Sequence, residues 1–176
     1  MTRFGTSPLA LMAVLAVAVG LPAAAAAPAA AATTYTITDL GSLGGGVTRG
    51  LAINASGQVT GDSVLSTLVQ VPCPPQRYGG PQKCFKHPDD AFVWSNGTMT
   101  DLGSNFSPAA VNDSGVIVGG QFVYNGGTLQ NLNNLIPAGS GYQIQNATGI
   151  NDNGQIVANA TDTATNQGHA LLLTPN

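Results

Sequence analysis

The chain has 176 residues, enough for one domain with a core of ordinary size. Lys and Arg number five against eight Asp, Glu is absent, and the formal net charge is −3. So few cations cannot neutralise a nucleic-acid backbone or hold the chain on an anionic membrane, which excludes both partners. Thr, Asn, Ser and Gly supply the polarity, and Val, Ile and Leu are frequent, a balance typical of β-rich extracellular domains.

The first 32 residues are typical of an export signal. Arg3 precedes an apolar run over residues 8–21, and small residues follow as far as Ala32. The run has about 14 residues, short of the roughly 20 that span a bilayer as a helix. We therefore expect cleavage after Ala32, and a secreted, soluble protein in which residues 33–176 form a single β-repeat domain.

An internal repeat organises the remaining sequence. An apolar residue, Asn, two polar residues and Gly precede an apolar segment three times, with the Asn at positions 54, 112 and 151. Asn tolerates left-handed backbone and Gly takes positive φ, so each copy predicts two strands joined by a tight turn. A second hairpin is predicted through Asn96-Gly97 and again through Asn125-Gly126.

The third copy reaches only residues 169–173, without a return strand. The order of apolar and polar residues over 36–41 matches the return strand predicted over 98–103. We therefore expect an N-terminal strand that completes the last unit, joins the two ends of the domain and protects the sheet edges.

The predicted fold class is all-β, with three four-stranded repeat units. Propeller-like blades and a threefold trefoil- or prism-like closure both fit, as do pairing of chains into a larger ring and a small open stack. The core is expected to contain Phe92, Trp94, Val118, Phe122, Tyr124, Ile156 and Leu172.

These segments resemble the HAF-type repeats of bacterial extracellular proteins. The His-Ala-Phe signature corresponds to Asp90-Ala91-Phe92, in part to Gln121-Phe122, and to His169-Ala170-Leu171. The resemblance covers most of residues 35–173. It implies an exported β-rich repeat protein and no established catalytic residues, so no functional residue is carried over from it.

The first unit carries an insertion at about residues 64–89 that the other two lack. Cys73 and Cys84 within it favour one disulfide in an oxidising compartment, because the two thiols with His87 match zinc spacing poorly. A long loop on a rigid scaffold is a common place for binding groups. The basic and aromatic side chains that could bind an anionic or carbohydrate ligand there are Arg77, Tyr78, Lys83, Phe85, Lys86 and His87. A surface excursion without a ligand is the alternative.

Other polar residues are better explained by structure than by chemistry. His169 begins a strand, and Asp39 and Asp101 occupy equivalent places before Leu-Gly, which favours turn or sheet-edge hydrogen bonds. Asp113 and Asp152 lie in the Asn turns, but the first copy has Ala at that position and the six or more oxygens that calcium needs are missing.

The expected function is non-catalytic extracellular recognition, without a metal or a cofactor. The favoured partner is a carbohydrate or another cell-surface component. A structural role through self-association is one alternative, and an extracellular polymer hydrolase is another.

Overall fold

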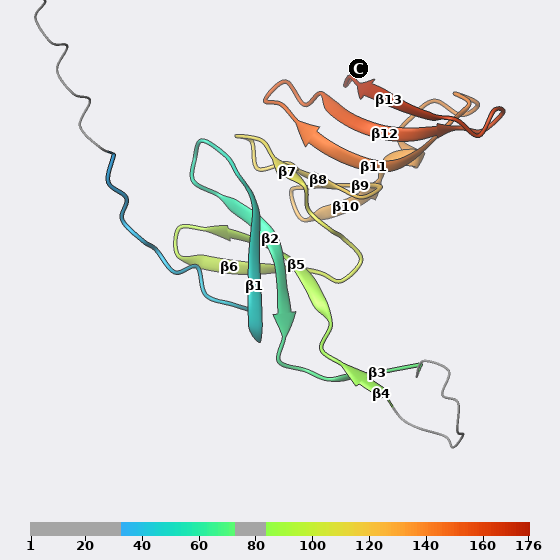
Figure 1. Ribbon diagram of the computed structural model, residues 1–176. Coiled ribbons are helices and arrows are strands. Elements are labelled where there is room, and N and C mark those ends of the chain that lie inside the picture. The colour runs from blue at the N-terminus through green and yellow to red at the C-terminus, as the bar shows by residue number, and fades with distance from the viewer. Residues whose placement is uncertain (1–32, 73–83) are drawn as a thin grey trace, which may run out of the picture. The chain divides into compact units, whose positions relative to one another are not determined.

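The computed structural model describes residues 33–72 and 84–176, and these residues form antiparallel β-sheets (Figure 1). The expected export signal and the centre of the insertion lie outside the described residues. Thr38–Asn176 is one compact unit, distinct from Met1–Ile37. The only helical turn in the described part is the 3-10 turn η1 (Leu132–Asn134), so the all-β prediction is confirmed. Within this part, no helix is long and apolar enough to cross a membrane.

Three sheets follow one another along the chain (Figure 1). The first has the order β1-β2-β5-β6, the second β10-β9-β8-β7 and the third β11-β12-β13. The bounds are β1 (Gly44–Ile53), β2 (Val59–Leu65), β5 (Asp89–Ser95), β6 (Thr98–Gly103), β7 (Ala110–Val111), β8 (Ile117–Gly119), β9 (Phe122–Asn125), β10 (Thr128–Asn131), β11 (Tyr142–Ile150), β12 (Ile156–Asp162) and β13 (Gly168–Leu173). A two-stranded ribbon of β3 (Val69–Val71) and β4 (Cys84–Lys86) connects β2 to β5.

The predicted Asn turns are present in all three units. The side-chain Oδ1 of Asn54, Asn112 and Asn151 accepts a hydrogen bond from the N–H four residues later, at 2.8, 2.9 and 2.9 Å. The Gly that ends each turn has φ of +77°, +76° and +75°. These turns join β1 to β2, β7 to β8 and β11 to β12, so the repeat interpretation of the hairpins is confirmed.

Each unit carries two sets of cross-strand neighbours on opposite faces of its sheet. We call the set directed at the preceding unit the leading row and the set directed at the following unit the trailing pair. The leading rows are Ile53-Val59-Trp94, Val111-Ile117-Tyr124 and Ile150-Ile156-Leu173. The trailing pairs are Thr60-Val93, Val118-Val123 and Val157-Leu172.

Two apolar clusters form where these sets meet. Val111, Ile117 and Tyr124 pack with Ala91 and Val93 of the first sheet. In the second cluster, the trailing pair of the second unit packs with the leading row of the third. Both boundaries between these three sheets are therefore a trailing side against a leading row.

The prediction of an N-terminal strand that completes the last unit is wrong. Residues 33–42 form no strand, and Tyr35 and Ile37 are 87% and 94% exposed. Asp39 Oδ1 instead accepts the N–H of Gly41 at 3.0 Å, and the N–H of Leu43 donates to Ser63 Oγ at 3.0 Å. The segment is thus bent locally and then attached to the first sheet. The third sheet keeps three strands, and the sheets are not closed.

The predicted core is right at some positions and wrong at one. Phe92 and Val118 are fully buried and Ile156 is 8% exposed, whereas the other aromatic residues of the predicted set are half-buried. Leu172 is 63% exposed, because it lies on the trailing side of the third sheet and no described segment covers that side.

Candidate functional site

A polar recess of 260 Å³ lies on the first sheet. β1 contributes Arg49, β2 contributes Asp62, and β5 contributes Asp89 and Asp90. The loop after β6 completes the recess. The full set of lining residues is Arg49, Asp62, Asp89, Asp90, Ala91, Ser104, Phe106 and Ser107.

Strand register explains how these acids meet. Arg49 is the cross-strand partner of Asp62, and their side chains form an ion pair of 2.9 Å. The Arg49 side chain is 62% exposed, so this pair adds little to stability but compensates one of the three carboxylates. Asp89 and Asp90 pair with Val64 and Ser63 at the start of β5, and alternation along the strand exposes Asp89 while it buries Asp90.

Asp90 is the unusual group of the recess. Its residue is 7% exposed, and Oδ1 is buried without a hydrogen-bond partner in the described part of the chain. Burial raises the pKa of Asp90, and the nearby Asp101, through its charge and a side-chain hydrogen bond, raises it further.

Asp101 reaches this place through an irregularity in β6. The register shifts between the pairs Ala91–Gly103 and Phe92–Asp101, as expected of a bulge, which re-aims side chains. Asp101 Oδ1 also accepts the N–H of Gly103 at 2.8 Å. The predicted hydrogen-bonding role of this residue, and of the equivalent Asp39, is therefore confirmed.

The insertion begins and ends beside the recess. The N–H of Leu65 donates to the carbonyl of Pro88 at 2.9 Å, which brings the two ends of the insertion together immediately before Asp89. His87 Nδ1 donates to the carbonyls of Leu65 and Thr67, at 2.9 and 3.2 Å, because carbonyl oxygens only accept. Only Nε2 of this ring is left to meet a ligand.

The other predicted ligand-binding residues are only partly described. Phe85 and Lys86 belong to β4, where Lys86 is exposed and pairs with Val69. Arg77, Tyr78 and Lys83 lie outside the described residues. Cys84 opens β4, and since Cys73 also lies outside them, the disulfide stays a prediction.

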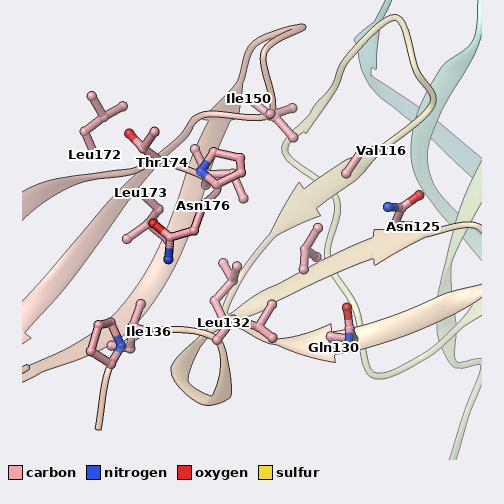
Figure 2. A pocket seen from close by; sticks show the side chains of 16 residues that line it. Val116, Asn125, Gln130, Leu132, Ile136, Ile150, Leu172, Leu173, Thr174 and Asn176 are labelled. Carbon is pink, nitrogen blue, oxygen red and sulfur yellow. The ribbon is translucent and has the colours of Figure 1, made fainter. Parts of the chain in front are cut away.

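A larger cavity of 530 Å³ opens beside the cluster between the second and third sheets (Figure 2). Leu132, Ile136, Ile150 and Leu173 line it together with a few amide and hydroxyl groups, but no charged side chain does. His169 lies elsewhere on β13, where its ring and that of Tyr142 form a T-shaped pair with 5.7 Å between centroids. Neither place combines a titratable group with a cavity, so the acidic recess is the stronger site.

The sequence analysis did not single out the recess, although it holds a signal. The residue eight positions after the turn Asn is Asp62 in the first unit, Gly120 in the second and Asn159 in the third. Asp62 is thus an acid that the repeat does not require. Together with the tandem Asp89-Asp90 at the end of the insertion, it marks a departure from the repeat. In the described part of the chain, no group of three His, Cys, Asp or Glu could hold a metal ion.

The chain matches no family model, no curated protein and no solved structure. The resemblance to HAF-type repeats therefore stays a prediction, and the function has to be argued from the site itself.

Proposed function

We propose that this protein is an exported, non-catalytic recognition protein that binds carbohydrate hydroxyl groups in the acidic recess, with the insertion as a neighbouring contact surface. The observation that carries the proposal is Asp90, which lines the recess and whose buried Oδ1 has no hydrogen-bond partner in the described part of the chain. A buried acceptor without a partner is costly, and a ligand hydroxyl would relieve that cost.

The composition of the recess favours a neutral polyol over an anion. Three carboxylates face one guanidinium, so an acidic ligand would be repelled. Carboxylates accept from two hydroxyls at once, while Ser104 and Ser107 can both donate and accept. The insertion adds the exposed Lys86 and, outside the described residues, Tyr78, whose ring would stack on a sugar face.

Hydrolysis of an extracellular polymer is the second candidate, because one carboxyl of the pair has a raised pKa. Retaining glycosidases, however, separate their two carboxyl groups by roughly 5 Å, and inverting enzymes by more. Asp101, by contrast, does not line the recess, and its Oδ1 is already engaged by the N–H of Gly103 at 2.8 Å. Turnover of a polysaccharide panel that is lost in Asp101→Asn or in His169→Ala would favour this candidate over recognition.

Binding of neutral oligosaccharides, measured first on an array and then by calorimetry, tests the proposal. Asp90→Ala should weaken binding at least about tenfold, the effect of losing one hydrogen bond to a charged group. The matched control Asp39→Ala removes an acid from an exposed turn outside the recess and should leave affinity unchanged.

The contribution of the insertion is separable. A double variant with Arg77→Ala and Tyr78→Ala should weaken binding if the insertion touches the ligand, and should leave it unchanged if the recess acts alone. Absence of binding above background across the array would refute the proposal, as would binding that neither Asp90→Ala nor the double variant weakens.

A further inference from the structure

Two kinds of hydrogen bond connect the Asn turns of successive units. In the first kind, the turn Asn uses its side-chain amide. Asn54 Nδ2 donates to the backbone carbonyl of Asn112 at 2.9 Å, and Asn112 Nδ2 donates to the carbonyl of Asn151 at 3.1 Å. Each unit therefore donates to the one that follows it.

The second kind uses the residue after the turn Asn. The N–H of Ala55 donates to Asp113 Oδ1 at 2.7 Å, and the N–H of Asp113 donates to Asp152 Oδ1 at 2.8 Å. The Asp carboxylate thus serves the preceding unit. Ala55 has no carboxylate, so the first unit lacks this acceptor on its own leading side.

The third unit has donors that no described residue uses. The N–H of Asp152 has no acceptor in the described part of the chain. Asn151 Nδ2 donates to Gln155 Oε1 at 2.8 Å, just as Asn54 Nδ2 donates to Gln58 Oε1 at 2.7 Å. Asn54 donates its second amide hydrogen to the carbonyl of Asn112 in the next unit. The corresponding hydrogen of Asn151 has no acceptor in the described part of the chain.

The apolar sets at the two ends of the stack are exposed in whole or in part as well. Val118 and Val123, the trailing pair of the second unit, are 0% and 8% exposed against the third unit. The equivalent Val157 and Leu172 are 46% and 63% exposed. Figure 2 shows Leu172 and Leu173 directed to opposite sides of β13. At the other end, Ile53 of the first leading row is 68% exposed, whereas Val59 and Trp94 of the same row are half-buried.

We infer that the trailing side of the third unit binds the leading row of the first unit in a second copy of this chain, head to tail. Val157 and Leu172 would then cover Ile53, Val59 and Trp94, as a trailing pair covers a leading row inside the chain. Asn151 Nδ2 would donate to the carbonyl of Asn54, which repeats the first kind of bond.

A face-to-face dimer of two trailing sides is excluded by the same bonds, because it would bring the Asn151 and Asp152 donors of both copies together without their acceptors. The first unit of a second copy supplies the apolar leading row and the Asn54 carbonyl that a head-to-tail contact requires. It lacks only the Asp carboxylate, because Ala55 occupies that position. The contact between copies is therefore weaker than the contacts between units, and it can be strengthened at this one position.

Sedimentation equilibrium of the protein and of three single variants tests the inference. The protein should self-associate, and Leu172→Asp and Ile53→Asp should each remove the association, because either change places a charge in the contact. Thr128→Asp, at an exposed position of β10 in the second unit, is the control that adds the same charge and should leave association unchanged. All three variants should keep the thermal unfolding transition of the parent, since each replaced side chain is exposed.

Two further arms separate head-to-tail docking from other arrangements. A mixture of Ile53→Asp with Leu172→Asp retains one intact contact and should form a dimer that neither variant forms alone. Ala55→Asp supplies the missing acceptor and should tighten association about tenfold, as expected of a hydrogen bond to a charged group. A protein that stays monomeric at high concentration overturns the inference, and so does association that only one end variant removes. Failure of the mixture to pair, or of Ala55→Asp to tighten association, overturns it equally.

Discussion

Asp90 shows how the first unit departs from a purely structural repeat. Its carboxyl lies in the sheet next to Ser63 and is nearly covered, and burial followed by the charge of Asp101 raises its pKa. Most buried polar groups in proteins have partners, so a carboxyl oxygen without one destabilises the fold unless something else binds it. This cost is consistent with a ligand site, where the missing partner comes from outside the chain.

The raised pKa of Asp90 predicts how stability depends on pH. Between the ordinary value of 3.8 and the raised pKa of the folded carboxyl, the unfolded carboxyl is charged while the folded one still holds its proton, so stability falls as pH rises through this window. Asp90→Asn removes the charge. It should raise the melting temperature at neutral pH, and the gain should shrink as the pH falls below 3.8.

Asp162 is the matched comparison, because its pKa is shifted the other way. Backbone N–H groups of Ala164 and Thr165 donate to its Oδ1 and lower the pKa of this carboxyl. Its contribution to stability is therefore present above 3.8 and is lost on acidification, and Asp162→Asn should destabilise the protein at neutral pH. The measurement is the melting temperature of each variant, relative to the parent, across pH. If both variants were shifted in the same direction at neutral pH, the opposite pKa shifts of Asp90 and Asp162 would be contradicted.

Residue-level prediction from the sequence succeeded where the repeat itself carried the information. Asp39 and Asp101 stand at equivalent positions, and both bond the N–H two residues later, as expected. From the sequence alone, Asp90 is only a variant of a signature position. Its burial depends on the β6 bulge and on the loop through Phe106, and neither feature has a local sequence pattern that fixes it.

At the scale of the element, the Asn turn both closes a hairpin and joins units. Asn112→Ala would lose the bond from the Val116 N–H and the bond to the Asn151 carbonyl, at a residue that is 5% exposed. We expect a loss of about 2–3 kcal/mol in the free energy of unfolding, measured in urea.

Asn151→Ala provides the comparison, because this exposed turn loses only bonds within itself. Its expected cost is about 1 kcal/mol. Equal costs for the two variants would show that the bonds between units contribute nothing, which would also remove the basis for docking a second copy through them.

Hairpins were predictable because two- to four-residue turns obey strong local rules for Asn and Gly. Local rules do not predict which faces of the strands are buried. Val118 and Val157 are equivalent apolar residues after a turn, yet the first is fully buried and the second is 46% exposed. Only the order of the sheets decides between them, and the same order left Leu172 exposed although its pattern is that of a core residue.

At the scale of the whole molecule, the described fold is a directional series of units, each stabilised by its neighbours. In such proteins the stability is close to a sum of unit terms and interface terms. The second unit has an interface on both sides, whereas the first and third have one each. The two end faces are therefore the ones without a neighbour in the described part of the chain, whereas the acidic recess shares Ala91 and Phe106 with the cluster between the first and second units.

The segment before β1 gives the last prediction. Removal of residues 33–41 should change the melting temperature by less than about 2 °C, because the segment forms no strand and most of it is exposed. Ser63→Ala is the control for sensitivity. It removes the fully buried hydroxyl that accepts from Leu43 and bonds Thr48 Oγ1 at 2.9 Å, and should cost about 1–2 kcal/mol. A large drop in melting temperature for the shortened chain would mean that the segment completes a sheet after all. In that case it would occupy the free edge of β13, and the third unit would have four strands like the others.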